Sequence, residues 1–367
     1  MTDTNAQTQT GDSLLATTDT ALETAGSSRP WRHIVARYAV PDTRRGVMQL
    51  LTTGLPFLAI MSALLYLIDR GVWAALTLVV PSAALLVRLF AIQHDCGHGS
   101  FFRSRQANDW LGRTLGVLTF TPYAYWRQKH AVHHATSGNL DRRGVGDIDT
   151  LTVREYLTRS RWMRFAYRLY RHPVVMLGLG PAYLFLIRHR IPTGWPSRHW
   201  RGWASVLGTN AALAAAAASM ALTIGLQPLL LGYLPVLLLA ASIGVWMFYV
   251  QHQFADTYWE EGSRWTFERA AFDGCSFYDL PRILHWATGS LGFHHLHHLS
   301  SRIPNYRLRE CFEQNPVFQR AAKRLRLWES LKGFRLALWD EETRQLVPFR
   351  RLRDGGGGGC GKPMRTR

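Results

Sequence analysis

The sequence predicts an all-α integral membrane protein, with four transmembrane helices in two hairpins and a cytoplasmic helical cap that holds a di-metal site. Three observations lead to this prediction. Four long runs of the 367-residue chain carry almost no charge. The basic residues, which give a formal net charge of +18, gather between and beside those runs. Histidines form three tight clusters at the ends of the apolar runs or beyond them.

The apolar runs cover about residues 47–68, 72–93, 203–224 and 228–250. Each approaches the ~20 residues that an α-helix needs to cross a ~30 Å hydrocarbon core. Buried helices of a soluble protein are the alternative, and four runs of this length disfavour it. Arg88, near the end of the second run, can extend its guanidinium to the membrane surface. We therefore expect each run to span a bilayer.

The connections predict how the spans are arranged. Residues 69–71 and 225–227 join the runs in pairs, so each pair forms a hairpin. The other segments are rich in arginine, and the positive-inside rule places both termini and the middle segment in the cytoplasm. This accounts for the positive charge without nucleic acid, for which the sequence carries no motif. We expect one domain at 29–353, between disordered tails at 1–28 and 354–367.

The histidine clusters have the spacing of metal ligands on helices. His94 and His98 lie four residues apart, so they share one face of a helix that continues from the second span. The other two clusters repeat this spacing, and one more histidine follows the fourth span. The candidate ligands are His94, His98, His130, His133, His134, His252, His294, His297 and His298. We expect His295 to support this set from outside it or to be exposed.

Each ligating imidazole also needs a partner for its second ring nitrogen. Six aspartates near the clusters could fill this role, and the sequence does not rank them. They are Asp95, Asp147, Asp149, Asp256, Asp273 and Asp279.

Nine imidazoles exceed what one ion needs, and a helical bundle lets them converge on two ions. Neutral imidazole suits Fe, Zn, Cu or Ni. A hydrolytic zinc site commonly has three protein ligands and a carboxylate base, as in HExxH, and this sequence contains no HExxH. The ligand count therefore favours oxygen activation, with no separate protein acid or base assigned. A metal transporter, a zinc-dependent membrane hydrolase and a non-enzymatic scaffold are the other classes.

The clusters resemble those of the membrane fatty acid desaturases. Their pattern is HDCGH at 94–98, followed by HxxHH at 130–134 and at 294–298. Longer stretches are similar to the bacterial omega-6 (delta-12) acyl-lipid branch: HATSGNLD from His134, YVQHQF from Tyr249, GFHHLHHL from Gly292 and RIPNY from Arg302. The similarity covers roughly residues 39–308.

The resemblance implies two iron ions bound by the eight cluster histidines, with His252 as the additional ligand that some members place after the last span. It implies O2 as co-substrate and the removal of two hydrogens from an unactivated acyl chain of a membrane lipid, which gives a cis double bond and water. It also implies ferredoxin or a similar external electron donor and, through the bacterial branch, the bacterial inner membrane. The predicted topology places the active site, like both termini, on the cytoplasmic side. Arg142 and Arg143 are candidate contacts for an acidic ferredoxin.

One position departs from related enzymes. Acyl-CoA desaturases place an asparagine one turn before the ligand on the last span, where this chain has Phe248. The nearest alternative on the same scaffold is a lipid hydroxylase, or a carotenoid hydroxylase or ketolase. These reactions also begin with hydrogen abstraction, so the metal ligands do not separate them from desaturation.

Overall fold

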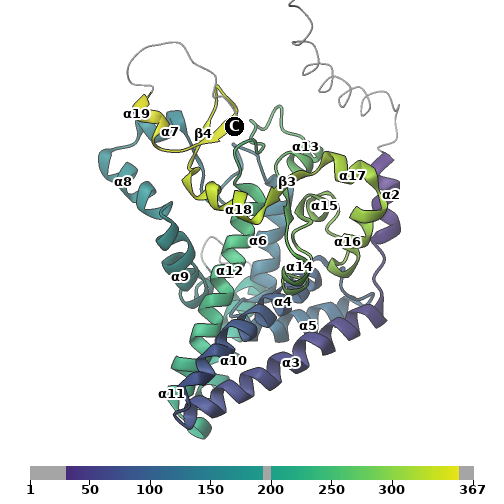
Figure 1. Cartoon of the computed structure of the whole chain (residues 1–367), viewed down its shortest axis with the longest axis vertical. Coiled ribbons are helices and arrows are strands. Elements are labelled where there is room, and N and C mark those ends of the chain that lie inside the picture. The colour runs from purple at the N-terminus through teal and green to yellow at the C-terminus, as the bar shows by residue number, and fades with distance from the viewer. Residues whose placement is uncertain (1–29, 193–199, 355–367) are drawn as a thin grey trace, which may run out of the picture.

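The computed structural model of the chain describes residues 30–192 and 200–354 (Figure 1). The tails predicted at 1–28 and 354–367 lie outside this part of the chain, apart from Asp354, the last residue of α19 (Arg351–Asp354).

Four helices are long and apolar enough to cross a membrane, as the sequence predicted. They are α3 (Thr43–Asp69); η1 with α4 (Trp73–Leu78 and Val79–His98); α10 (Trp200–Ile224); and α11, η4 and α12 (Leu226–Pro228, Leu229–Tyr233 and Leu234–His252). The second and fourth helices continue past the expected ends at residues 93 and 250. The added turns carry His94, His98 and His252, so the change from apolar to polar sequence ends neither helix.

The α4 helix is the centre of the membrane-spanning part, because α3, α5 and α12 all pack on it. Leu64 and Ile68 of α3, Leu86 and Leu89 of α4, and Val236 of α12 share one buried core. Burial of these aliphatic side chains excludes lipid and fixes the helix ends relative to one another. The ends of α4 and α12 that carry histidines therefore lie together.

The α10 helix is placed differently. It packs mainly on α6 (Tyr123–Thr136), and its apolar window has no residue buried inside the protein. Such a helix presents its side chains to lipid. Gly225, with φ of 82°, makes the sharp turn from α10 into α11, a conformation that side chains with a Cβ rarely adopt.

The remaining described helices lie mainly beyond the histidine-bearing ends of α4 and α12 (Figure 1). They are α2 (Pro30–Tyr38), α5 (Arg105–Leu118), α6, α7 (Val153–Thr158), α8 (Arg161–Tyr170), η2 (Val175–Leu179), α9 (Gly180–Leu186), η3 (Arg188–Arg190), α13 (Phe267–Phe272), α14 (Arg282–Ala287), α15 (His294–Leu299), α16 (Asn305–Gln314), α17 (Pro316–Ala321), α18 (Leu327–Ser330), η5 (Leu331–Arg335) and α19.

Two small sheets modify the all-helical fold that the sequence predicted. β1 (Leu151–Thr152), β4 (Leu338–Asp340) and β5 (Gln345–Val347) form one sheet, and β2 (Ser276–Asp279) pairs in parallel with β3 (Lys323–Arg326). Strands of two to four residues are too short for alternating apolar and polar residues to reveal them. The Tyr278 amide of β2 donates to the Gly292 carbonyl at 2.8 Å and so holds the chain that leads into α15.

Candidate metal centre

The nine histidines predicted as ligands gather in one place, although they come from four helices. α4 and α12 present theirs at or near their C-terminal ends. α6 and α15 lie beyond those ends and present three each. The contributions are His94 and His98 from α4, His130, His133 and His134 from α6, His252 from α12, and His294, His297 and His298 from α15.

The histidines form two groups, and each group could hold one metal ion. If one nitrogen is taken from each ring of a group, these nitrogens all lie within 4.8 Å of one another. The five-histidine group contains His94, His98, His130, His134 and His297. The four-histidine group contains His133, His252, His294 and His298. The two groups adjoin, because the rings of His134 and His298 stack with their centroids 4.1 Å apart. Among the residues that the structure describes, no carboxylate belongs to either group.

Several ring nitrogens approach one another at distances that a shared ion explains. The Nε2 atoms of His252 and His294 are 2.9 Å apart. The Nε2 atom of His134 lies 3.1 Å from that of His130 and 3.0 Å from that of His297. Two nitrogens bound to one ion at ~2.1 Å, with an angle of ~90° between the bonds, lie about 3 Å apart. The observed spacing therefore suits rings that converge on a common ion.

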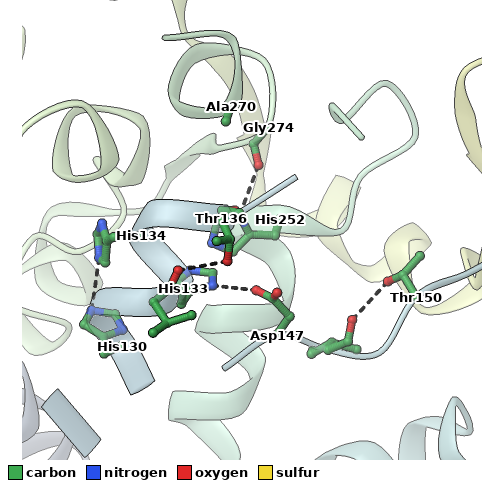
Figure 2. Close-up of polar contacts among 12 residues, drawn as sticks. His130, His133, His134, Thr136, Asp147, Thr150, His252, Ala270 and Gly274 are labelled. Atoms are coloured by element: carbon green, nitrogen blue, oxygen red, sulfur yellow. Dashed lines mark hydrogen bonds and ion pairs between the residues drawn. The ribbon is translucent and has the colours of Figure 1, made fainter. Parts of the chain in front are cut away.

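Two rings of the four-histidine group have outer partners that fix which nitrogen faces inward (Figure 2). The Nδ1 atom of His133 lies 2.5 Å from Oδ1 of Asp147, and Nδ1 of His252 lies 3.1 Å from the Gly274 carbonyl oxygen. A carboxylate and a carbonyl accept hydrogen bonds, so each Nδ1 carries the proton. Each Nε2 is left with a free lone pair, which is the form of histidine that binds a metal.

A third outer partner supports the five-histidine group. Oδ1 of Asp95 lies 3.3 Å from Nδ1 of His94, and Oδ2 accepts a hydrogen bond of 2.6 Å from the Asn305 amide. Asp95 thus connects the end of α4 to the start of α16. Of the six aspartates proposed as outer partners, Asp95 and Asp147 contact a cluster ring. The other four lie elsewhere: Asp149 is near Tyr170, and the remaining three form the ion pairs Asp256–Lys323, Asp273–Arg269 and Asp279–Arg324.

The buried nitrogens show that the donor set fits two metal ions. The Nε2 atoms of His98, His133 and His298 are buried and have no hydrogen-bond partner within the described chain. Buried polar atoms rarely stay unpaired, and a bound cation would satisfy these lone pairs. Hydrogen bonds between rings could account for the close nitrogen pairs, but they would leave the lone pairs of these three Nε2 atoms without a partner.

Burial also sets the charge of the cluster. Outside the membrane-spanning helices, removal from water lowers the pKa of five cluster histidines well below the usual range, and neighbouring imidazoles add to this effect. These five are His130, His134, His294, His297 and His298. Rings with such a low pKa stay neutral and keep a lone pair for a metal, so they need no deprotonation before binding.

His295 lies outside both groups. Its ring is fully buried, with 0% exposure, and packs near Phe277 and Phe312 at centroid distances of 6.1 and 5.7 Å. Burial lowers the pKa of His295 to about 3. The expectation that it could be exposed is therefore wrong. Successive residues of a helix point about 100° apart, so His295 faces the apolar core when His294 faces the metal centre.

Three residues near the centre were missed in the sequence. Trp126 stacks on His130 with centroids 4.7 Å apart, and its position four residues before His130 could have indicated this contact. Gly274 acts through its backbone carbonyl, for which no residue type is a signal. Asn305 reaches Asp95 from more than 200 residues away. Phe248, noted as a departure, lies near His133 and His252, with centroids 5.0 and 5.4 Å apart.

The fold and the site together define a four-span membrane protein with an all-histidine centre that could hold two metal ions. Comparisons with known proteins identify the family. A model of the family described as fatty acid desaturase matches residues 71–329. The chain is 44% identical over 319 residues to a fatty acid desaturase of Bacillus subtilis, across 87% of this chain and 90% of that protein.

More distant relatives carry more specific names. The chain is 29% identical over 231 residues to an sn-1 acyl-lipid omega-3 desaturase (ferredoxin) of Synechocystis, across 61% of this chain and 62% of that protein. It is 26% identical over 318 residues to a chloroplastic omega-3 fatty acid desaturase of Glycine max, across 80% of this chain and 66% of that protein. The chain therefore belongs to the fatty acid desaturase family and is an oxidoreductase, an acyl-lipid fatty acid desaturase.

Proposed function

We propose that the protein is an O2-dependent desaturase that introduces a cis double bond into the acyl chain of a membrane lipid, using two iron ions bound by the nine clustered histidines. One observation carries this proposal: two adjoining all-histidine groups lie at the ends of membrane-spanning helices. Imidazole suits iron among other metals, and membership of the desaturase family favours iron with O2 over hydrolytic zinc.

Bound iron would supply the oxidising power that breaks two unactivated C–H bonds. The overall reaction converts two acyl hydrogens, O2, two electrons and two protons into a double bond and two water molecules. The residues of the chain hold the ligands in place: Asp147 orients His133, and the Gly274 carbonyl orients His252. Phe248 and Trp126 cover neighbouring rings, which limits the access of water to the centre.

The location of the centre suits a substrate that is dissolved in the membrane. His94, His98 and His252 end two spanning helices, so an acyl chain in the adjacent leaflet can reach the histidines without leaving the lipid. We further propose that the membrane is the bacterial inner membrane and that both termini and the metal centre face the cytoplasm. The arginine-rich segments on the histidine side support this orientation.

The position of the new double bond has two candidates. The stretches that follow His134, Tyr249 and Gly292 resemble the omega-6 (delta-12) branch, so we propose that position first. The relatives from Synechocystis and Glycine max are named omega-3 desaturases, and this makes the omega-3 position the second candidate.

Fatty-acid profiling in a host that makes only monounsaturated lipids tests the proposal. The protein is expressed with and without added linoleic acid. A new cis-9,12 diene without the addition supports omega-6 activity, whereas a new triene that forms only with linoleic acid identifies omega-3 activity. Hydroxy fatty acids would identify a lipid hydroxylase instead. An unchanged profile in both cultures, from iron-loaded protein, would contradict the proposal.

Matched variants tie the product to the metal centre. His133→Ala removes one buried ring of the four-histidine group, so we expect no new fatty acid. His172→Ala changes an exposed histidine outside both groups, so the profile should match that of the unchanged chain.

Ferredoxin or a similar carrier is the proposed electron donor, which the name of the Synechocystis relative supports. The two arginines that the sequence suggested as a docking site are not equivalent. Arg142 is exposed. Arg143 donates to the Thr150 carbonyl at 2.8 Å and pairs with Glu155, so it also has a structural role. Arg142 is therefore the residue with which docking can be tested cleanly.

A further inference from the structure

The α8 helix presents an apolar stripe beside a row of arginines. Trp162, Phe165 and Leu169 lie three and four residues apart and share one face, where they are 81%, 59% and 51% exposed. A second row on the neighbouring face is formed by Arg161, Arg164 and Arg168. Each of these three side chains is more than half exposed within the described part of the chain.

No carboxylate neutralises the arginine row. Residues 156–255 contain nine arginines and no aspartate or glutamate. Within the described residues, Arg161, Arg164 and Arg168 form no ion pair; the nearby pairs use Arg143 and Arg154 instead. The row therefore keeps its positive charge available for an anion outside the protein.

The chain that follows α8 shows where this helix lies. Met176 of η2 packs with Met247 and Val250 near the histidine-bearing end of α12. Leu186, at the end of α9, joins the core that also contains Leu239 and Ile243 of α12. η2 and α9 thus run along α12 from its histidine-bearing end toward the middle of the span.

The outward side chains of this descending segment are apolar. Val174, Leu179, Tyr183 and Ile187 are 67%, 65%, 55% and 53% exposed, which suits contact with lipid. Figure 1 shows α8 and α9 following each other along one edge of the molecule, with α9 beside α12. α8 therefore lies at the level where α12 leaves the membrane.

Hydrogen bonds on the inner face of α8 keep its apolar stripe turned outward. The buried Tyr167 hydroxyl donates to the Ala337 carbonyl at 2.6 Å and accepts from the Leu151 amide at 3.1 Å. Arg171, just after the helix, donates to Oε1 of Gln253 at 2.9 Å. Rotation of Trp162 into the core would break these bonds.

We propose that α8 is a membrane-surface helix that inserts Trp162, Phe165 and Leu169 among the lipids and binds anionic headgroups through Arg161 and Arg164. An amphipathic helix with a basic face binds where apolar burial and attraction to anionic lipid act together. The ligand is the phosphate of an acidic phospholipid in the surrounding bilayer. Each arginine near such a surface strengthens binding about fivefold. This interaction is separate from the reaction at the histidine groups.

Spin-label accessibility in the full chain tests the proposal. A nitroxide is attached at Ala166→Cys, which is exposed on α8 beside the stripe and leaves the stripe intact, in a chain with Cys360→Ser. Cys96, Cys275 and Cys311 are buried and should not react. The control label is at Thr343→Cys, exposed in the turn between β4 and β5. Nanodiscs that hold one chain or two chains are prepared from phosphatidylcholine, alone or with phosphatidylglycerol.

We expect the label at position 166 to meet O2 more often than a water-soluble nickel complex, and most strongly in discs with phosphatidylglycerol. The label at position 343 should meet nickel in both discs. Each arginine contributes about fivefold to the affinity for an anionic surface. Changing Arg161→Gln and Arg164→Gln together should therefore raise, several-fold, the fraction of phosphatidylglycerol at which the label is half-maximally protected from nickel.

Three results would overturn the proposal. Equal nickel access at positions 166 and 343 in both discs would mean that α8 does not touch the membrane. Equal protection with and without phosphatidylglycerol, unchanged by the two glutamines, would exclude binding of anionic headgroups. Protection that appears only when two chains share a disc would show that a second copy covers the stripe.

Discussion

The two histidine groups differ in ligand number and in support. The five-histidine group has one more ring than the four-histidine group. Asp95 supports one of its rings, His94, at 3.3 Å, and several of the others approach one another. The four-histidine group is buried throughout, and its members His133 and His252 are fixed from outside by Asp147 and Gly274. Metal binding by the four-histidine group therefore depends more on the fixed orientation of its rings, whereas the five-histidine group has an additional ring. We expect the removal of one histidine to reduce activity more in the four-histidine group than in the five-histidine group.

Removal of one ligand from each group should give the largest effects. His294→Ala leaves three rings in its group, so we expect activity to fall by more than about 100-fold, beyond the range seen when only an outer partner of a ligand is lost. His130→Ala leaves four rings and should retain measurable activity. Double-bond formation by equal amounts of iron-supplied protein measures the difference. Equal losses of activity in the two variants would show that the two groups do not differ in this way.

Asp147→Asn should give the next largest effect. The amide can no longer accept the Nδ1–H of His133 with a full negative charge, so the ring is less firmly oriented and less basic. We expect a loss of about 10- to 100-fold in activity or metal affinity. Asp273→Asn, which alters an exposed pair with Arg269 outside the centre, is the matched control and should have little effect. An Asp147→Asn variant as active as this control would refute the role of the carboxylate.

Phe248→Leu should have a moderate effect. The change removes an aromatic ring beside His133 and His252 but keeps an apolar side chain of similar size. We expect the free energy of unfolding to fall by ~1 kcal/mol and turnover to fall less than about tenfold, with unchanged iron content. Denaturant unfolding and iron analysis measure the two quantities. Loss of iron would instead give Phe248 a direct part in ligand geometry.

Arg142→Glu should have the smallest effect. The reversed charge weakens attraction to an acidic ferredoxin, so KM for ferredoxin should rise about fivefold at low salt, while kcat stays the same. The difference should shrink as salt screens the charges. Arg142→Lys keeps the charge and serves as the control. Unchanged ferredoxin-driven turnover and salt dependence would remove Arg142 from the docking surface.

Helical spacing and the predicted topology together predicted which histidines meet, but not how these histidines divide into two groups. His133 and His134 are neighbours in the sequence, yet they belong to different groups, as do His297 and His298. Adjacent helical residues point about 100° apart, so the division depends on which helices face each turn. That information is tertiary, and five-residue motifs do not contain it.

Outer partners were harder to predict than ligands for a related reason. Asp147 and Asp149 are two residues apart in one loop, and the fold turns only Asp147 toward His133. The spans were predictable because ~20 apolar residues have a physical length that matches the membrane. Strands such as β1, with two residues, have no comparable pattern and form through partners distant in the sequence.

Metal analysis of the purified, active chain tests the central claim most directly. Elemental analysis with Mössbauer spectroscopy should find two iron ions per chain, coupled to each other, and His294→Ala should lower the iron content while His172→Ala leaves it unchanged. One metal ion per chain, or zinc in place of iron in protein that forms double bonds, would contradict the account.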